Sequence, residues 1–365
     1  MLTPHDSQWM AQALQLAERG LYSTSPNPRV GCVLVKDGKQ VGSGWHVKAG
    51  EPHAEVHALR EAGAAAQGTT AYVTLEPCSH YGRTPPCADA LMAAGVARVV
   101  VAMQDPNPLV AGQGIARLRA AGIVVDSGLM EAPARELNLG FVKRMTQGLP
   151  WLRSKIAMSL DGRTALHNGV SQWITGAEAR RDGHRWRARS CAVLTGIDTV
   201  LADDAQLSVR DVGTPRQPLR VVLDSLLRLP HTARILQGGK VLVYTASSDA
   251  NKIAVLRQAG AEVVVLAGAR GQVDLPACLS DLAARGLNEV LVEAGRTLNG
   301  ALLQAGLLDE LIVYLAPQLL GDAARGMAAL GELTALEQRV ELAWQDVRQV
   351  GKDLRVIARI QKNQD

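Results

Sequence analysis

Four side chains within residues 53–87 could together form a catalytic zinc site. His53 precedes Glu55 by two positions, and Cys78 and Cys87 each follow a proline. An imidazole and two thiolates suit zinc, and three protein ligands leave the fourth tetrahedral position to water, as in catalytic sites. Zinc lowers the pKa of that water to about 7. With Glu55 as a carboxylate that is not a ligand, this set predicts hydrolytic deamination of a nucleobase-like ring.

His57 is a rival ligand, because residues four apart lie on one face of a helix. A zinc helix of the H-E-x-x-H type, however, has its Glu directly after the first His, and here that position is Ala54. We therefore expect His57 to pack or to form hydrogen bonds.

Three residues near this set are candidates for substrate contacts. Eight residues separate the two cysteines, where deaminases of cytosine or adenine show P-C-x-x-C. The intervening loop contains His80 and Arg83, and Arg83 is expected to pair with an anionic group. Asn27 lies in a proline-flanked turn, where its amide could bind a ring carbonyl and an exocyclic amine.

The first half of the chain must position these residues, and its pattern alternates strands with helices. Helices are expected at 8–20, 52–63, 86–94, 113–121 and 131–147, and strands at 30–35, 40–45, 70–75, 96–103 and 123–127. Such alternation predicts an α/β layer sandwich. The helix that ends before Gly148 closes a first domain, residues 1–147.

Residues 148–365 show a second alternating series. Strands are expected at 151–158, 191–195, 219–224, 240–245, 261–266, 288–293 and 311–316, and helices at 177–188, 250–258, 276–285 and 298–305. The segments 341–350 and 354–360 predict a terminal hairpin. A glycine turn after Glu293 opens a helix whose backbone N–H groups would suit a diphosphate, although it lacks the G-x-G-x-x-G pattern.

Composition limits the class of protein. The 365 residues are 47% hydrophobic with a net charge of only +4, and they include six Trp, five Tyr and one Phe. This balance allows anionic metabolites but does not favour nucleic acid as a partner. Five dispersed cysteines indicate reduced thiols, with Cys32, Cys191 and Cys278 as buried, inert ones. No signal peptide or membrane span is evident, so we expect a cytoplasmic protein.

Three segments of the first half carry a family resemblance. SPNPRVGCVLVKDG, HAEVHAL and TLEPCSHYGRTPPC resemble the riboflavin-biosynthesis branch of the zinc-dependent cytidine-deaminase superfamily. The long cysteine spacing is what that branch shows. The resemblance implies His53, Cys78 and Cys87 as zinc ligands and Glu55 as the proton shuttle.

The second half resembles the reductase half of bifunctional riboflavin-biosynthesis enzymes, a relative of dihydrofolate reductase. SKIAMSLDGR, SQWITG, LTGIDTVLADDAQLSVR, VVLDS and EAGRTLNGALL carry this resemblance, whereas 230–285 and 320–340 are read only as scaffold. It implies that NADPH lies along Ala157, Trp173, Thr199, Asp203, Ser225, Gly295, Arg296, Thr297, Leu298, Asn299, Gly300 and Ala301. It implies that the pyrimidine sugar phosphate contacts Ser171, Arg187, Leu207, Arg210 and Glu293.

Together these features predict a cytidine-deaminase-like αβα sandwich followed by a dihydrofolate-reductase-like α/β domain. The expected reactions are zinc-dependent deamination of a pyrimidine ribotide and NADPH-dependent reduction of its ribosyl group to ribityl. A homodimer through the reductase half is expected by resemblance. The alternatives are a nucleoside or tRNA deaminase fused to an unrelated reductase, and a zinc-stabilised binding protein with a fourth protein ligand.

Overall fold

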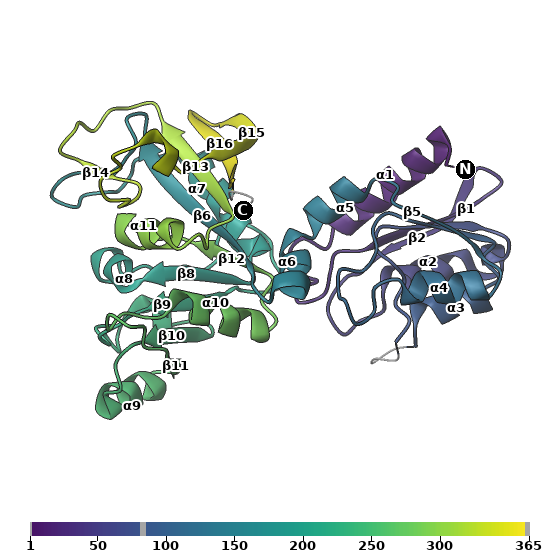
Figure 1. Ribbon diagram of the computed structural model, residues 1–365, viewed down its shortest axis with the longest axis horizontal. Coiled ribbons are helices and arrows are strands. Elements are labelled where there is room, and N and C mark those ends of the chain that lie inside the picture. Colours follow the sequence, from purple (N-terminus) through teal and green to yellow (C-terminus); the bar gives the residue numbers. More distant parts are fainter. Residues whose placement is uncertain (1, 81–84, 362–365) are drawn as a thin grey trace. The chain divides into compact units, whose positions relative to one another are not determined.

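The computed structural model describes residues 2–80 and 85–361, and the chain divides into two compact units, Met1–Leu149 and Pro150–Asp365 (Figure 1). The division falls two residues after the expected one. Both units are α/β, and each has its own sheet. In the described part of the chain, no helix combines the length and apolarity needed to cross a membrane.

The first unit is built on a five-stranded sheet in the order β2-β1-β3-β4-β5. β1 pairs antiparallel with both β2 and β3, and β3, β4 and β5 are parallel. The strands span Gly31–Lys36, Lys39–Trp45, Thr70–Val73, Arg98–Val101 and Val124–Ser127. All five were expected from the sequence, since each is a short apolar run bounded by turn residues.

Helices cover both faces of this sheet. One apolar core joins the strands to α2, α3 and α4, and another joins them to α1, α5 and α6. The helices span Pro4–Glu18 (α1), Ala54–Ala62 (α2), Cys87–Ala93 (α3), Gln113–Ala120 (α4), Glu131–Leu137 (α5) and Leu139–Gln147 (α6). The result is the predicted three-layer sandwich.

α2 lies unusually close to β2. A Cβ added at Gly42 would lie 2.3 Å from the Ala58 carbonyl oxygen, and one at Gly44 would lie 2.6 Å from that of Ala54. Only glycine on the strand permits this approach, because a side chain there would overlap the backbone of the helix. It holds the first turn of α2, which carries His53 and Glu55, against the sheet.

The single helix expected over 131–147 is wrong, because the chain forms two helices that meet at Asn138. The buried Asn138 amide accepts a hydrogen bond from the Arg29 N–H (2.8 Å) and donates one to the Arg29 carbonyl (3.0 Å). Its backbone, at φ −120° and ψ 20°, leaves the helical region. A long-range contact therefore overrides the local helical pattern.

The second unit contains a nine-stranded sheet in the order β11-β10-β9-β8-β12-β6-β13-β16-β15. Its strands from β11 to β13 run parallel, and β16 and β15 are added antiparallel at one edge. The strands span Trp151–Ser159 (β6), Ala192–Gly196 (β8), Leu219–Leu223 (β9), Val241–Thr245 (β10), Ala261–Val265 (β11), Glu289–Val292 (β12), Glu310–Ala316 (β13), Leu342–Val350 (β15) and Asp353–Ile360 (β16).

Helices flank this sheet as expected. They are α7 (Ala177–Arg189), α9 (Ala250–Gln258), α10 (Leu275–Ala284) and α11 (Arg296–Gln304), and a short α8 (Ile197–Asp203) was not foreseen. A small two-stranded sheet of β7 (Arg163–Ala165) and β14 (Arg325–Gly326) was also not foreseen. α7 packs on Leu291, Ile312 and Tyr314.

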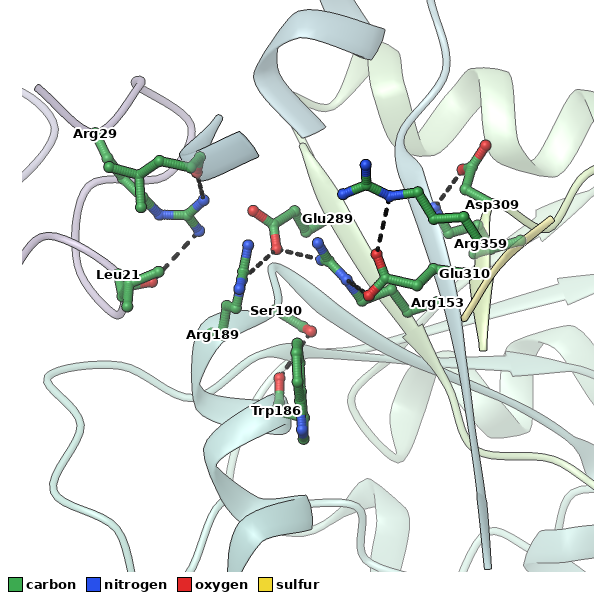
Figure 2. A network of polar contacts seen from close by, with 12 residues as sticks. Leu21, Arg29, Arg153, Trp186, Arg189, Ser190, Glu289, Asp309, Glu310 and Arg359 are labelled. Atoms are coloured by element: carbon green, nitrogen blue, oxygen red, sulfur yellow. Dashed lines mark hydrogen bonds and ion pairs between the residues drawn. The ribbon is translucent and has the colours of Figure 1, made fainter. Parts of the chain in front are cut away.

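A buried ionic network closes the amino end of the parallel strands (Figure 2). Arg153 donates to Glu289 (2.5 Å) and to Glu310 (3.0 Å), and Arg189 also donates to Glu289 (2.9 Å). Glu289 and Glu310 open β12 and β13, and Arg153 is the third residue of β6. Paired charges therefore occupy the edge of the sheet where these strands begin. In open α/β sheets, ligands bind at the opposite edge, at the carboxyl ends of the strands.

Candidate functional site

The three predicted zinc ligands converge in the first unit. His53 Nδ1 lies 3.3 Å from Cys87 Sγ and 3.6 Å from Cys78 Sγ, and the three ligand atoms all lie within 4.8 Å of one another. Ligands at zinc distances on tetrahedral corners stand about 3.6 Å apart. The donor set and its spacing therefore fit zinc with one corner left for water. Among the described residues, neither His57 nor His80 belongs to this group.

Each ligand is placed by an element boundary. His53 is the N-cap of α2, Cys87 is the first residue of α3, and Cys78 lies in the loop after β3. In the structure, the Cys87 N–H donates to Cys78 Sγ at 3.3 Å. Hydrogen bonding with Cys87 and His53 lowers the pKa of the Cys78 thiol, as metal binding requires.

Glu55 is buried beside these ligands, with only 3% of its surface exposed. Burial raises the pKa of its carboxyl to about 7, against the opposing effect of His53. Hydrogen bonding to Cys87 also opposes the rise in this pKa. A carboxyl group with a pKa near neutrality can both accept and donate a proton at physiological pH.

Asn27 faces a histidine that the sequence did not single out. Asn27 Nδ2 lies 3.0 Å from His46 Nε2, and His46 Nδ1 lies 3.2 Å from the Pro52 carbonyl oxygen. The carbonyl can only accept, so Nδ1 carries the proton and Nε2 accepts from the Asn27 amide. The His46 ring also packs edge-on against His53, with centroids 5.2 Å apart. These contacts orient the Asn27 amide beside the ligand group.

The loop between the cysteines is described only in part. His80 is exposed, and Arg83 lies outside the described residues. The structure adds Asp105 to this region, from the loop after β4. Burial raises the pKa of the Asp105 carboxyl, and both His80 and Cys78 act on it electrostatically. No spacing rule could have found Asp105, because it is distant in sequence from the ligands.

In the second unit, Glu293 is the centre of an ion cluster at the carboxyl end of β12. Arg187 of α7 binds it through two hydrogen bonds (2.5 and 2.9 Å), and Lys155 of β6 lies 3.1 Å away. Burial raises the pKa of the Glu293 carboxyl, but Arg187 and then Lys155 outweigh burial and hold it below its usual value. Lys155 was not among the expected residues, since a strand lysine carries no motif.

Arg210 joins the same region through its backbone. Its N–H donates to Nδ1 of the buried His184 at 3.2 Å, and both Arg187 and Arg210 act electrostatically on that imidazole. The Arg187 guanidinium is already paired with a carboxylate, whereas the Arg210 side chain is exposed. Arg210 is therefore the better placed of the two for a phosphate.

The helices α8 and α11 begin side by side at the carboxyl edge of the sheet. β8 and β12 are neighbours, and Gly196 and Gly295 are the N-caps of the helices that follow them. The Leu298 side chain lies 3.6 Å from a Cβ built on Gly196. This edge is where α/β sheets bind nucleotides.

The residues expected around NADPH differ in their exposure to solvent. Arg296, Thr297, Asp203 and Trp173 are exposed, while Ala157, Thr199, Leu298 and Ala301 are half-buried. Ser171, expected on the substrate side, is also half-buried. The guanidinium carbon of Arg180 lies 4.6 Å from the centroid of the Trp173 ring. Asp203 accepts a hydrogen bond from the Gln172 side chain, and this bond joins the 171–173 segment to the end of α8.

Four other expected residues make hydrogen bonds or packing contacts with other parts of the chain. Asn299 is buried and bonded to Ser154 of β6 (2.9 Å), and Gly300 packs against Ala329. Leu207 belongs to an apolar core, and the Ser225 hydroxyl accepts from the Val273 N–H at 3.1 Å. Segments 230–285 and 320–340, read only as scaffold, therefore contact the expected site through Val273 and Ala329.

Two protein families match this chain. Residues 150–356 match the RibD C-terminal domain, and residues 3–103 match the cytidine and deoxycytidylate deaminase zinc-binding region. The riboflavin biosynthesis protein RibD of Escherichia coli is 51% identical, over 96% of this chain and 98% of that protein. The chain belongs to the RibD family.

Solved structures of the RibD family support the whole fold. Form 1 of Acinetobacter baumannii RibD has a TM-score of 0.92 at 50% identity, covering 98% of this chain and 99% of that one. A diaminohydroxyphosphoribosylaminopyrimidine deaminase/5-amino-6-(5-phosphoribosylamino)uracil reductase from Thermotoga maritima has a TM-score of 0.87 at 32% identity, with coverage of 98% and 99%. The predicted fold class is confirmed.

Membership of the RibD family confirms the predicted class of activity. The chain is a bifunctional enzyme of riboflavin biosynthesis that combines a zinc-dependent deaminase with an NADPH-dependent reductase. A nucleoside or tRNA deaminase fused to an unrelated reductase is not supported, and neither is a zinc-stabilised binding protein. It acts on small pyrimidine compounds.

Proposed function

We propose that residues 1–147 deaminate 2,5-diamino-6-ribosylamino-4(3H)-pyrimidinone 5′-phosphate and that residues 148–365 reduce the ribosyl group of the product. The observation that carries the proposal is the convergence of His53, Cys78 and Cys87 on one point beside the buried Glu55. In the proposed order of reactions, the ring amine leaves first and the sugar is reduced second.

In the deaminase, His53, Cys78 and Cys87 would hold zinc, which would supply an acidified water as nucleophile at neutral pH. Glu55 accepts the proton of that water on its carboxylate. It returns that proton to the ring nitrogen, then takes the second proton from the hydroxyl now on the ring carbon and passes it to the leaving amine, so the water oxygen stays on the ring as a carbonyl and ammonia departs.

Three residues would hold the pyrimidine ribotide for this step. Asn27 donates one amide hydrogen to His46 and keeps its carbonyl oxygen for the exocyclic amine of the ring. His80 and Arg83 would contact the sugar phosphate, since both lie in the loop between the cysteines. The half-buried Asp105, on whose carboxyl His80 acts electrostatically, would be a further acceptor for ring or sugar groups.

In the reductase, bound NADPH would supply the hydride needed to convert the ring-opened sugar to ribityl. The proposed cofactor site follows the starts of α8 and α11, with Ala157, Trp173, Thr199, Asp203, Ser225 and residues 295–301. Glu293 and Lys155 bring an acceptor and a donor to within 3.1 Å of each other for the sugar hydroxyls, and Arg210 would bind the phosphate. Ser171, Arg187 and Leu207 complete the substrate side.

One coupled assay tests this assignment. Starting from the diaminopyrimidine ribotide, the enzyme should release one equivalent of ammonia, and NADPH should then be consumed. Free nucleosides and RNA, supplied side by side, should give no ammonia. NADPH consumption that precedes or lacks ammonia release would contradict the order of reactions.

We also propose that the enzyme acts in the cytoplasm as a homodimer through the second unit. Five free cysteines suit a reducing compartment. β15 is an edge strand with Trp344 and Val347 68% and 56% exposed, and such edges favour pairing with a second copy. Sedimentation equilibrium of the wild type and Val347→Lys would test the dimer, which the lysine should weaken.

A further inference from the structure

Glu76, which was not among the predicted site residues, accepts hydrogen bonds from four backbone N–H groups. Its Oε2 accepts from Asp105 (3.1 Å) and Gly112 (2.9 Å), and its Oε1 accepts from Gly114 (2.8 Å) and Ile115 (3.1 Å). Its own N–H donates to the Met103 carbonyl at 3.0 Å. The side chain is only 5% exposed. Glu76 therefore joins the strand end before Cys78 to the whole segment that leads into α4.

α4 approaches the Cys78 segment as closely as a backbone allows. A Cβ added at Gly114 would lie 2.0 Å from the Pro77 carbonyl oxygen and 3.2 Å from Glu76 Oε1. Further along α4, Arg117 donates to the Ser79 carbonyl (3.2 Å). The two residues that flank Cys78 in sequence are thus each held against α4.

The same helix also reaches the second thiol. Arg117 pairs with Asp89 at 2.8 Å, and Asp89 lies in the first turn of α3, which begins at Cys87. Both cysteine segments are therefore fastened to one element. Three metal ligands must keep their spacing to a few tenths of an ångström. A common support for two of them would hold the two thiols at the separation that zinc requires.

We propose that Glu76 is a positioning residue for the zinc site: it anchors α4, and α4 in turn sets the separation of Cys78 and Cys87. This inference rests on the proposed function of these two thiols as zinc ligands. A carboxylate is required because it offers acceptors only. An amide at this position would present an NH₂ group to two of the N–H donors and leave them unpaired in the interior.

The test measures zinc affinity rather than activity alone. Wild type, Glu76→Gln and Glu76→Asp, each as the full chain, are titrated with zinc in competition with a chromophoric chelator. Glu76→Gln should weaken zinc binding by about 10- to 100-fold, as loss of a residue that orients metal ligands does. Glu76→Asp keeps the charge but is one methylene shorter, and its affinity should lie between the other two.

Asp6→Asn is the matched control. Asp6 is a buried carboxylate of the same unit that pairs with Arg98 (2.7 Å) and Tyr72 (2.7 Å), away from both thiol segments. It should lower the melting temperature of the unit while changing zinc affinity by less than about twofold. NADPH oxidation on the deaminated intermediate should be normal in every variant.

Two results would overturn the proposal: wild-type zinc affinity in Glu76→Gln, or equal weakening in Asp6→Asn. If Glu76→Gln does not fold, Glu76→Asp decides alone, and a wild-type dissociation constant there counts against the role. Failure of the proposed function is a separate outcome, namely wild-type enzyme that binds zinc but releases no ammonia from the ribotide.

Discussion

Glu55 shows how one residue's surroundings select its chemistry. The first turn of α2 places it beside two thiols and an imidazole, and the close packing of α2 on β2 removes it from water. Burial then raises the pKa of its carboxyl to about 7. An exposed glutamate two positions from a histidine would be fully ionised and would donate poorly.

The first prediction concerns this proton transfer. Glu55→Gln keeps the size of the side chain but removes its ability to carry a proton, so ammonia release should fall by about 10²- to 10⁴-fold. NADPH oxidation on the deaminated intermediate should remain. Glu61→Gln, an exposed change on the same helix, should leave both rates unchanged. A Glu55→Gln enzyme with normal ammonia release would exclude the shuttle role.

At the scale of elements, α7 links the core of the second unit to its site. Its buried Asp182 accepts from Tyr314 of β13 (2.7 Å) and from Arg355 of β16 (2.8 Å), while Arg187 reaches Glu293. Between them lies His184, whose pKa is lowered to about 4 by burial and by the charges of Arg187 and Arg210. One helix thus carries both the packing and the polar contacts.

A second prediction follows from His184. Its pKa in the folded chain lies below that of an unfolded chain, so between about pH 6.5 and pH 4 the unfolded state binds the extra proton. The free energy of unfolding should therefore decrease as pH falls through this window, by at most about 1.4 kcal/mol per pH unit for one proton. Urea titrations of His184→Gln should show a flatter pH dependence. His231→Gln, at an exposed site, should retain the wild-type slope.

A third prediction concerns α11. A Cβ at Gly300 would lie 2.2 Å from the Ala329 carbonyl oxygen, so Gly300→Ala should push the 327–330 segment away and tilt the helix start proposed to bind NADPH. Such overpacking costs about 1–3 kcal/mol. We expect a higher KM for NADPH with ammonia release unaffected. Gly183→Ala, in α7 with open space around its Cβ, should keep a normal KM.

At the scale of the whole molecule, two complete folding units carry the two chemistries. The unit Met1–Leu149 has apolar cores on both faces of its own sheet, and Pro150–Asp365 has a separate sheet and core. Because each unit has its own apolar core among the described residues, the loss of one site should leave the other site assembled.

The fourth prediction tests this independence through the metal. Chelation should abolish ammonia release, because the nucleophile is lost, and should leave NADPH oxidation on the deaminated intermediate intact. Added zinc should restore the deaminase. Parallel loss of both rates on chelation would show that the second unit depends on the metal.

The sequence by itself determined the class of fold and nearly every strand, and it predicted the ligand set and the proton shuttle, because these depend on short spacings and local periodicity. His53, Cys78 and Cys87 each stand at a predicted element boundary, so their meeting could be anticipated. Only the tertiary structure decided which distant groups pair: Lys155 with Glu293, His46 with Asn27, Asn138 with Arg29, and Glu76 with the amides before α4. These contacts arise when buried polar groups must find partners in whatever segments the packing brings near, and no local pattern encodes that choice.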